Sequence, residues 1–250
     1  MEASEYIINQ DYLTPAARAK KEELENNPLS RTNHMEYMEG MEQISSDIID
    51  KVMSEVASYD YDRYTDRDVA RVIASLKDKS RQTNMTGCSV EDFKVLLSPA
   101  AKPHIEELAR LAHDVTRSHF GNSVYIFTPL YIANYCENYC VYCGFNCYNH
   151  IKRKKLSMQE IEHEMQVIAN SGIEEILMLT GESRSMSDIS YIGDACKLAT
   201  KYFRNVGLEI YPVNTDEYHY LHECGADYIT VFQETYDADT YEKLHLMGHK

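Results

Sequence analysis

Residues 134–145, NYCENYCVYCGF, decide how the rest of this 250-residue sequence is interpreted. The stretch places Cys136, Cys140 and Cys143 at the spacing C-x3-C-x2-C. Thiolates are soft ligands that favour iron–sulfur clusters or zinc. Because a cubane cluster needs a ligand at each of its four irons, three cysteines leave one iron open to a substrate or cofactor. The spacing also differs from the ferredoxin run, which continues to a fourth cysteine followed by proline.

The sequence after residue 121 alternates between strand-like and helix-like segments. Strand patterns occur at residues 123–128, 175–179, 207–211 and 227–232. Helix patterns separate them or follow the last one, at residues 157–171, 188–203, 214–225 and 237–246. This alternation predicts an α/β fold with a parallel sheet. Because no glycine-rich phosphate loop follows the first strand, a TIM-type (β/α) barrel fits better than a dinucleotide-binding fold.

A barrel of this type carries its chemistry at the C-terminal ends of the strands. The cysteine loop, Thr180-Gly181-Glu182 and Gln233-Glu234-Thr235 follow the first, second and fourth predicted strands, so we expect them to lie together. A full barrel takes about 250 residues. The barrel part here runs only from Val124 to Lys250, which is 127 residues. We therefore expect a partial (β/α) barrel of about four strands with an unpaired last strand, in a chain truncated before the half that would close it.

The first half of the sequence predicts helices instead of strands. Residues 1–40 are polar and irregular, and helical apolar spacing follows at 41–59, 65–76, 89–97 and 101–119. Thr65 with Asp68 forms a capping box, and Ser89 begins the third of these helices. We therefore predict two domains, an α-helical N-terminal extension at residues 1–120 and the N-terminal half of the barrel at residues 121–250.

Composition and charge narrow the class of protein. The formal net charge of −15 argues against a nucleic-acid or anionic-membrane partner, which would need clustered positive charge. No apolar run is as long as a membrane span, and the N-terminal residues do not resemble a signal peptide. A cytoplasmic location is therefore expected. The seven cysteines are odd in number and unevenly spaced, unlike a secreted disulfide framework, and clustered thiols in a reducing compartment favour metal or redox chemistry.

A C-x3-C-x2-C loop after the first strand of a βα barrel resembles the radical S-adenosylmethionine enzymes. The resemblance implies that Cys136, Cys140 and Cys143 bind a 4Fe–4S cluster, whose open iron chelates S-adenosylmethionine. It also implies that Tyr142 lies beside the adenine and that Gly181-Glu182 receives the methionyl ammonium. A carboxylate suits that role, because an ammonium group in a dry site needs an ionised acceptor. Glu234 is a candidate for the ribose hydroxyls.

Further motifs resemble the tyrosine-lyase branch of that family. They are Pro129–Cys136, Cys143-Gly144-Phe145, Ile151–Leu156, Leu179–Glu182, Phe232–Tyr236 and His245–Lys250. Leu96–Ala101 and Phe120-Gly121-Asn122 are similar to the 2-iminoacetate synthases of thiamine thiazole biosynthesis. This resemblance implies cleavage of the Cα–Cβ bond of L-tyrosine to p-cresol and 2-iminoacetate (dehydroglycine). The implied partners are a reduced flavodoxin or ferredoxin-type electron donor and the thiazole synthase machinery.

Two alternatives remain open at this point. A sister tyrosine lyase of hydrogenase maturation would go on to make carbon monoxide and cyanide. A non-catalytic zinc module would use Cys147 as a fourth thiolate, with His150 nearby. If the cluster forms instead, Cys147 is a spare residue. The basic run at residues 152–155 is either a solvated approach to a helix or a counter-charge to carboxylates near the cluster.

Overall fold

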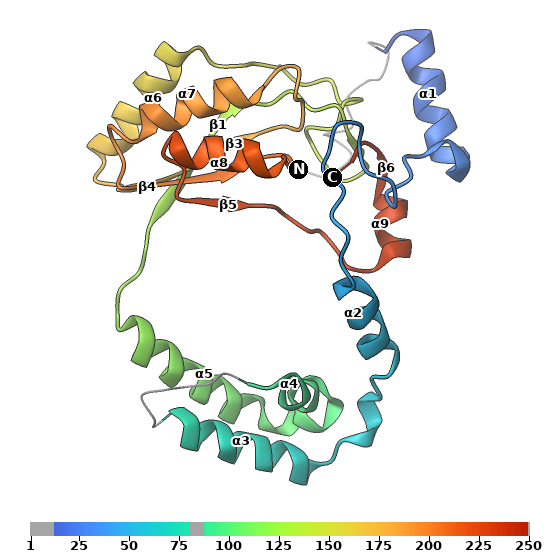
Figure 1. Cartoon of the computed structure of the whole chain (residues 1–250), viewed down its shortest axis with the longest axis vertical. Coiled ribbons are helices and arrows are strands. Elements are labelled where there is room, and N and C mark those ends of the chain that lie inside the picture. Colours follow the sequence, from blue (N-terminus) through green and yellow to red (C-terminus); the bar gives the residue numbers. More distant parts are fainter. Residues whose placement is uncertain (1–12, 81–87, 250) are drawn as a thin grey trace, which may run out of the picture. The chain divides into compact units, whose positions relative to one another are not determined.

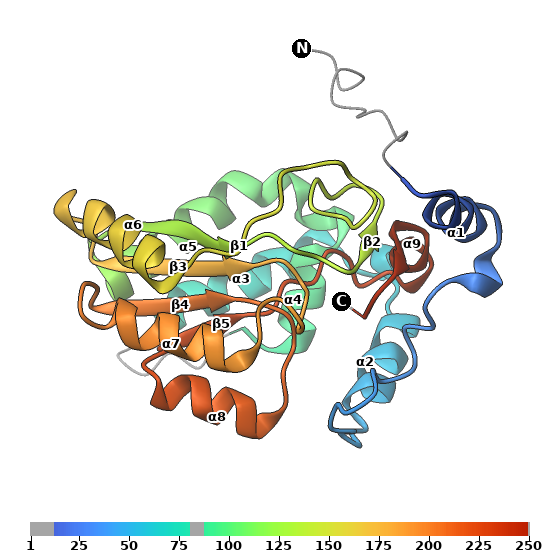
Figure 2. The ribbon, with the colours of Figure 1, turned by 90° about the horizontal axis from the view of Figure 1, so that it is seen from above.

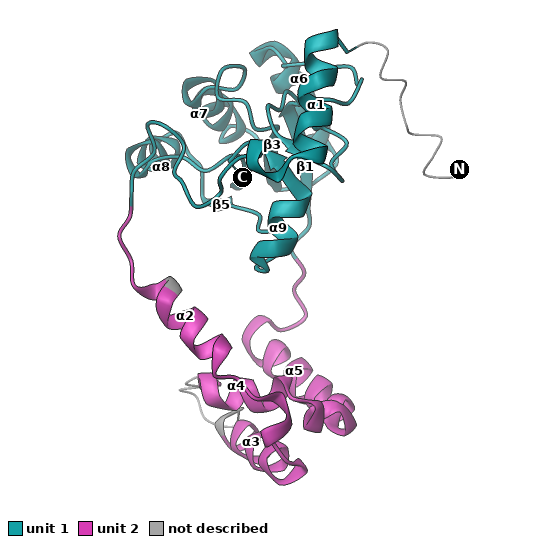
Figure 3. Cartoon of the chain, turned by 90° about the vertical axis from the view of Figure 1, so that its right-hand side faces the viewer, with its two compact units in different colours: residues 1–43, 125–250 teal, residues 44–124 magenta. Residues whose placement is uncertain are grey.

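The computed structural model describes residues 13–80 and 88–249 (Figure 1). Its contacts divide the chain into two compact units, residues 1–43 with 125–250 and residues 44–124 (Figure 3). The predicted domain boundary at residue 120 stays a prediction. Residues 1–12, which carry part of the predicted irregular stretch and the sequence tested for a signal peptide, lie outside the described part. Among the helices that are described, none has the length and apolar character needed to cross a membrane.

A four-stranded parallel sheet with the order β1-β3-β4-β5 forms the centre of the first unit (Figure 2). Its strands are β1 (Phe127–Ala133), β3 (Glu175–Thr180), β4 (Asn205–Glu209) and β5 (Tyr228–Thr230). The helices that connect these strands cover one face of the sheet and are α6 (Met158–Asn170), α7 (Ile189–Ala199) and α8 (Thr215–Glu223). Within the described residues the sheet is open, and β1 and β5 each have one neighbour. The predicted partial (β/α) barrel of four strands is therefore confirmed.

The core of this unit lies between the sheet and helices α6 to α8. Ile176 and Met178 on β3 are fully buried, and so are Met165 on α6 and Ile192 on α7. Four successive residues of β3 are buried, which explains why the sequence shows a continuous apolar run there and no alternation. Capping boxes at Ser157 and Asn214 begin α6 and α8, close to the starts of the helix patterns predicted at 157–171 and 214–225. Local sequence signals therefore place these elements well.

Strand β1 differs from its prediction, because Pro129 lies inside it and not at its end. The expected strand at 123–128 is wrong, and the pairing with β3 runs from Phe127 to Ala133. Proline cannot donate a ladder hydrogen bond and is therefore tolerated in a strand that has a neighbour on one side only. Here Pro129 pairs with Leu177 of β3, and among the residues that the structure describes no strand pairs with the other side of β1. The observed strand ends at Ala133 and not at Thr128, so it leads directly into the first residue of the cysteine loop, Asn134.

A helix and a two-stranded ribbon were missed. Helix α1 (Pro15–Asn26) lies in the stretch predicted to be irregular, where Thr14 caps it and Pro15 occupies its first position. Strand β2 (Tyr139–Cys140), inside the cysteine loop, pairs antiparallel with β6 (His245–Met247), which directly follows helix α9 (Ala238–Leu244). Leu13 and Leu24 pack with Tyr139, Tyr148 and Leu246 around this ribbon. The N-terminal segment thus covers the cysteine loop within the first unit.

The second unit is helical, as predicted. It contains α2 (Ile48–Ala57), α3 (Asp66–Ser80), α4 (Val90–Leu97) and α5 (Ile105–Phe120), with short 3-10 turns at Tyr61–Arg63 and Pro99–His104. Asp68 accepts from the backbone N–H of Thr65 at 3.0 Å, and Ser89 caps α4, so both predicted helix starts are confirmed. Helix α2 is shorter than the predicted 41–59. Its core consists of Val69, Val72, Ile73, Val95 and Ala101.

Candidate functional site

The cysteine loop begins where β1 ends and returns to the same place. The backbone N–H of Asn134 donates to the carbonyl of Lys154 at 3.1 Å, and that of Leu156 donates to Ile132 at 2.9 Å. Ala133 also forms an antiparallel bridge with Lys155. These contacts close the base of the loop at the C-terminal end of β1. The loop is therefore held on the sheet at the edge where barrel folds carry their chemistry.

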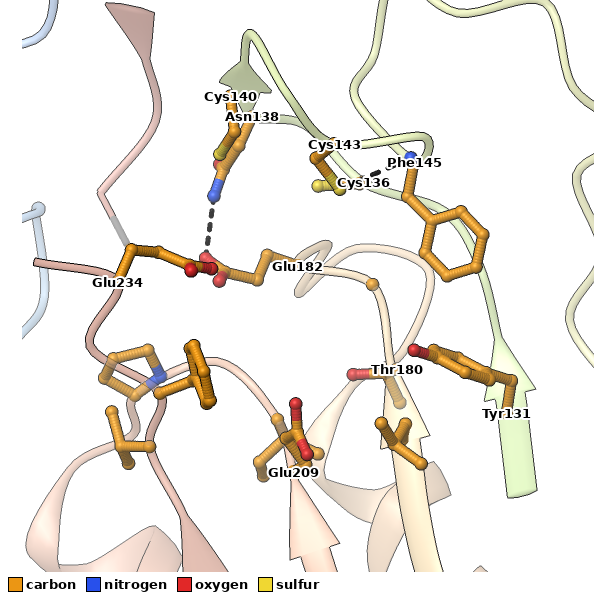
Figure 4. A pocket seen from close by; sticks show the side chains of 16 residues that line it. Tyr131, Cys136, Asn138, Cys140, Cys143, Phe145, Thr180, Glu182, Glu209 and Glu234 are labelled. Carbon is orange, nitrogen blue, oxygen red and sulfur yellow. Dashed lines mark hydrogen bonds between the residues drawn. The ribbon is translucent and has the colours of Figure 1, made fainter. Parts of the chain in front are cut away.

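All three thiols of the motif line a single pocket at this edge (Figure 4). Cys140 is buried, whereas Cys136 and Cys143 are half-buried. Burial raises the pKa of the Cys136 thiol, although backbone hydrogen bonds from Asn138 and Glu182 act in the opposite direction. A raised pKa means that a metal must displace a proton from this thiol, so ligand binding here is coupled to proton release. The geometry thus gathers the three cysteines that the spacing singled out.

The other polar groups of the pocket are mostly carboxylates. Glu182, Glu209 and Glu234 line it together with the three thiols, and none of the described lining residues is basic. The remaining wall is largely apolar and is formed by Tyr131, Phe145, Leu179, Ile210, Pro212, Val231 and Phe232. Carboxylates beside low-dielectric walls favour cations, because the walls focus their field. The pocket therefore suits a positively charged ligand such as a sulfonium or an ammonium group.

Glu182 is held in place by the cysteine loop. Asn138, itself 6% exposed, donates from its side-chain amide to the Glu182 carboxylate at 2.7 Å. The backbone N–H of Glu137 donates to the carbonyl of Glu182 at 3.0 Å. Glu137 in turn accepts hydrogen bonds from the hydroxyls of Ser183 and Ser185. The predicted Gly-Glu element and the cysteine loop are therefore one hydrogen-bonded assembly.

Gly181 makes this close approach possible. A Cβ atom placed there would lie 2.2 Å from the carbonyl oxygen of Tyr135, which belongs to the backbone of the cysteine loop. The N–H of Gly181 donates to the carbonyl of Ala133 at 2.9 Å, so the chain after β3 runs directly against the end of β1. Only a residue without a side chain fits between the two. The requirement for glycine at this position is thus steric.

Tyr142 does not itself line the pocket, but it contacts Glu234, which does. Its hydroxyl is 2.7 Å from Nε2 of His245, a side chain that is fully buried. The other ring nitrogen, Nδ1, donates to the carbonyl oxygen of Tyr241 at 2.9 Å. Burial, followed by hydrogen bonding to Glu234, raises the pKa of Tyr142. Tyr142 thus joins Glu234 to the ribbon of β2 and β6.

The donor set fits a cluster better than a single ion. Of the described His, Cys, Asp and Glu side chains, no three or more are gathered closely enough to hold one metal ion. A cubane is ligated at its separate corners, so its thiolates stand farther apart than the ligands of one zinc ion. Cys147 does not line the pocket, and burial raises its pKa to about 11. His150 is exposed. The residues of the zinc alternative are therefore not assembled as a site.

Two polar residues of the pocket, Glu209 and Asn138, were not singled out from the sequence. Glu209 ends β4, and the rule that barrel chemistry lies at strand ends could have indicated it. Asn138 lies within the cysteine loop, but no sequence pattern indicated a role for its side chain. The Thr180 hydroxyl is buried, lines the pocket and has no hydrogen-bond partner in the described part of the chain. It can therefore bind a ligand group without breaking an existing bond.

Comparison with known proteins gives an independent line of information. Residues 130–250 match the sequence pattern of the Radical SAM superfamily. The 2-iminoacetate synthase of Escherichia coli (strain K12) is 38% identical over 173 residues, which cover 69% of this chain and 46% of that protein. The chain thus spans about half the length of the curated relatives it matches.

Two solved structures share the fold. The crystal structure of HydG, a maturase of the FeFe-hydrogenase, superposes with a TM-score of 0.72 at 29% identity and covers 81% of this chain and 45% of that one. The crystal structure of methylornithine synthase (PylB) superposes with a TM-score of 0.55 at 28% identity and covers 68% of this chain and 51% of that one. The similarity therefore extends from sequence motifs to the arrangement of the sheet and helices.

Proposed function

We propose that this chain, whose residues 130–250 form a Radical SAM superfamily domain, is part of a lyase that cleaves the Cα–Cβ bond of L-tyrosine to p-cresol and 2-iminoacetate. Enzymes of this superfamily use a 4Fe–4S cluster and S-adenosylmethionine. The observation that carries the proposal is the pocket in which three thiols meet three carboxylates and no described basic side chain. Such a lining provides ligands for the cluster and a field that favours a sulfonium cofactor.

Each proposed residue has a defined task. Cys136, Cys140 and Cys143 hold three irons of the cluster. Glu182, aligned by the side-chain amide of Asn138, accepts the methionyl ammonium of S-adenosylmethionine. Glu234 is proposed to accept the ribose hydroxyls. The assignments agree with the placement of the three thiols, Glu182 and Glu234 around one pocket.

Tyr142 contributes through its ring, and Gly181 contributes by having no side chain. Tyr142 is proposed to lie beside the adenine, and its hydrogen bond to buried His245 fixes the direction of its ring. Gly181 allows the loop after β3 to approach the cysteine loop. Phe145 and Phe232 give the pocket an apolar wall that disfavours water beside the reacting atoms. Exclusion of water matters here, because a radical formed in contact with solvent or loose side chains would be lost to side reactions.

With the cluster held by Cys136, Cys140 and Cys143 and S-adenosylmethionine bound beside Glu182, the cofactors would supply one-electron chemistry that removes one hydrogen atom from tyrosine. The two carbon products together contain the atoms of tyrosine. The abstracted hydrogen is therefore replaced in p-cresol by a second electron and a proton. A reduced flavodoxin or ferredoxin-type protein is the proposed electron donor, and the thiazole synthase machinery is the proposed recipient of 2-iminoacetate.

Anaerobic reconstitution tests the proposal. The protein is treated with iron and sulfide, reduced, and supplied with S-adenosylmethionine and tyrosine. We expect a brown protein that forms 5′-deoxyadenosine together with p-cresol. Replacement of Cys136 by alanine should abolish both products, whereas replacement of Cys88, which lies in the other compact unit, should change neither. Formation of neither product by a protein that has taken up iron would refute the proposed reaction.

The similarity to the HydG structure supports one second candidate, a tyrosine lyase of hydrogenase maturation. This candidate forms p-cresol as well, so p-cresol alone does not distinguish the two. Cyanide and carbon monoxide should be measured in the same reaction mixture. We expect 2-iminoacetate, or the glyoxylate and ammonia formed by its hydrolysis, without cyanide. Cyanide in proportion to p-cresol would favour the maturation enzyme.

A further inference from the structure

The side chain of Arg153 reaches from the base of the cysteine loop to Phe145 and Asn146, which form the far wall of the loop. Its Nη1 donates to the backbone carbonyl of Asn134 at 2.6 Å and to that of Phe145 at 2.8 Å. Its Nη2 donates to the carbonyl of Asn146 at 2.7 Å. Asn134 precedes the first motif cysteine by two residues, and Phe145 follows the last by two. One guanidinium group therefore joins the chain before the three thiols to the chain after them.

This arrangement uses properties that are particular to arginine. The guanidinium group is planar and presents several donors in a fixed fork, whereas a lysine ammonium is a point charge on a flexible stem. Three carbonyl oxygens contacted from one plane hold the two walls of the loop at a set separation. The flanking residues of the basic run behave differently. Lys152 and Lys154 are exposed, and Lys154 instead pairs with Glu160 at 2.6 Å.

Few other hydrogen bonds of the cysteine loop join the chain before the three thiols to the chain after them. Asn146 and Asn149 donate to the carbonyl of Cys143, which stabilises the turn after the last cysteine. The backbone bonds between residues 132–134 and 154–156 close the base only. The backbone N–H of Cys147 also donates to the carbonyl of Asn138 at 2.9 Å, across the middle of the loop. Within the described residues, the hydrogen bonds that join Asn134 at the base to Phe145 and Asn146 are those of Arg153. Arg153 also forms no ion pair in the described part of the chain, so its charge is directed at the loop.

We propose that Arg153 is the positioning residue that sets the shape of the cysteine loop for cluster binding. The inference rests on the proposed function, because it presumes that the three thiols hold a cluster. Residues that orient metal ligands typically change metal affinity about 10- to 100-fold when they are replaced. Arg153 acts on the backbone that carries the ligands and not on a sulfur atom. Its loss should therefore loosen the loop before any metal is added.

The test compares Arg153→Gln, Arg153→Lys and the matched control Lys152→Gln in the whole protein. Lys152→Gln removes one charge from the same basic run without touching the loop carbonyls. Hydrogen exchange of the iron-free proteins is measured by mass spectrometry. We expect amides of residues 134–150 to exchange at least about tenfold faster in both Arg153 variants, as loss of a charged hydrogen bond predicts, with helix α7 unchanged. The control should match the parent.

Iron and sulfide per chain are then measured after reconstitution and gel filtration, with the electron paramagnetic resonance signal of the reduced cluster. We expect about tenfold weaker retention of iron in Arg153→Gln, with Arg153→Lys failing to restore it. Unchanged exchange at residues 134–150, equally faster exchange over the whole unit, or full restoration by lysine would overturn the inference. If the parent itself takes up no iron, the proposed function fails and the role of Arg153 in cluster binding fails with it. Faster exchange in the Arg153 variants would then show only that Arg153 stabilises the loop.

Discussion

Replacing Gly181 by alanine tests the contact on which the candidate site depends. The new Cβ would lie 2.2 Å from the carbonyl oxygen of Tyr135, 2.8 Å from its carbonyl carbon and 3.3 Å from the carbonyl carbon of Asn134. All three are backbone atoms, so no side chain can rotate away. Ordinary contact begins at 3.4 Å, so the loop after β3 and the cysteine loop must separate by about 1.2 Å.

The separation has two energetic consequences. Overpacking of a tight contact generally destabilises a fold by about 1–3 kcal/mol. The movement also strains the hydrogen bond from Gly181 to Ala133 and the one from Glu137 to Glu182, which cross the same gap. We therefore expect the free energy of unfolding to fall by about 2 kcal/mol, which lowers the thermal midpoint by about 5 °C for a unit of this size. The thiols should move with the loop, so iron retention should fall as well.

Gly144 provides the matched control. It lies in the same loop, directly after Cys143, and a Cβ atom there would meet nothing within 4 Å. Gly144→Ala should therefore change stability by less than about 0.5 kcal/mol. Because the protein lacks tryptophan, unfolding is followed by far-ultraviolet circular dichroism, and iron is assayed after reconstitution. If Gly181→Ala has the same thermal midpoint as Gly144→Ala and retains as much iron, the steric argument is refuted.

Three further predictions concern the surroundings of the loop. Cys147→Ala should retain the cluster and its visible absorbance, whereas Cys136→Ala should lose both; metal loss in Cys147→Ala would favour the zinc alternative. Asn138→Ala removes the donor to Glu182 and should weaken S-adenosylmethionine binding about tenfold by calorimetry, with iron content unchanged; equal binding would show that Glu182 needs no support. Hydrogen bonds from Lys154 and Ser157 lower the pKa of Glu160 to about 2 from an ordinary value of 4.5. The contribution of the Glu160 carboxylate to stability is therefore present above pH 4.5 and lost as the pH falls towards 2. The thermal midpoint of Glu160→Gln should lie below that of the parent at neutral pH, and the difference should shrink in acid. A difference that does not change with pH would contradict this assignment.

The sequence by itself determined the features that depend on neighbouring residues. Capping boxes at Ser157 and Asn214 act within one helical turn, so the starts of α6 and α8 could be located without a structure. The alternation of strands and helices predicted the parallel sheet for the same reason. The spacing of Cys136, Cys140 and Cys143 limits how far apart their thiols can be, so a shared metal site could be inferred from the loop alone.

Only the tertiary structure decided features that depend on residues far apart in the chain. Pro129 was expected to end a strand, but its tolerance depends on whether a strand lies on each side of β1, which local sequence does not contain. The pairing of Tyr139 and Cys140 with His245–Met247, and the bond from Tyr142 to His245, join segments about 100 residues apart. In the sequence, Arg153 is not distinguishable from its neighbours in the basic run. Only the structure shows that its guanidinium group contacts three backbone carbonyls of the cysteine loop. Long-range contacts form between surfaces that exist only after the elements pack. A one-dimensional pattern can therefore indicate candidate ligands but cannot show which distant residues hold them in place.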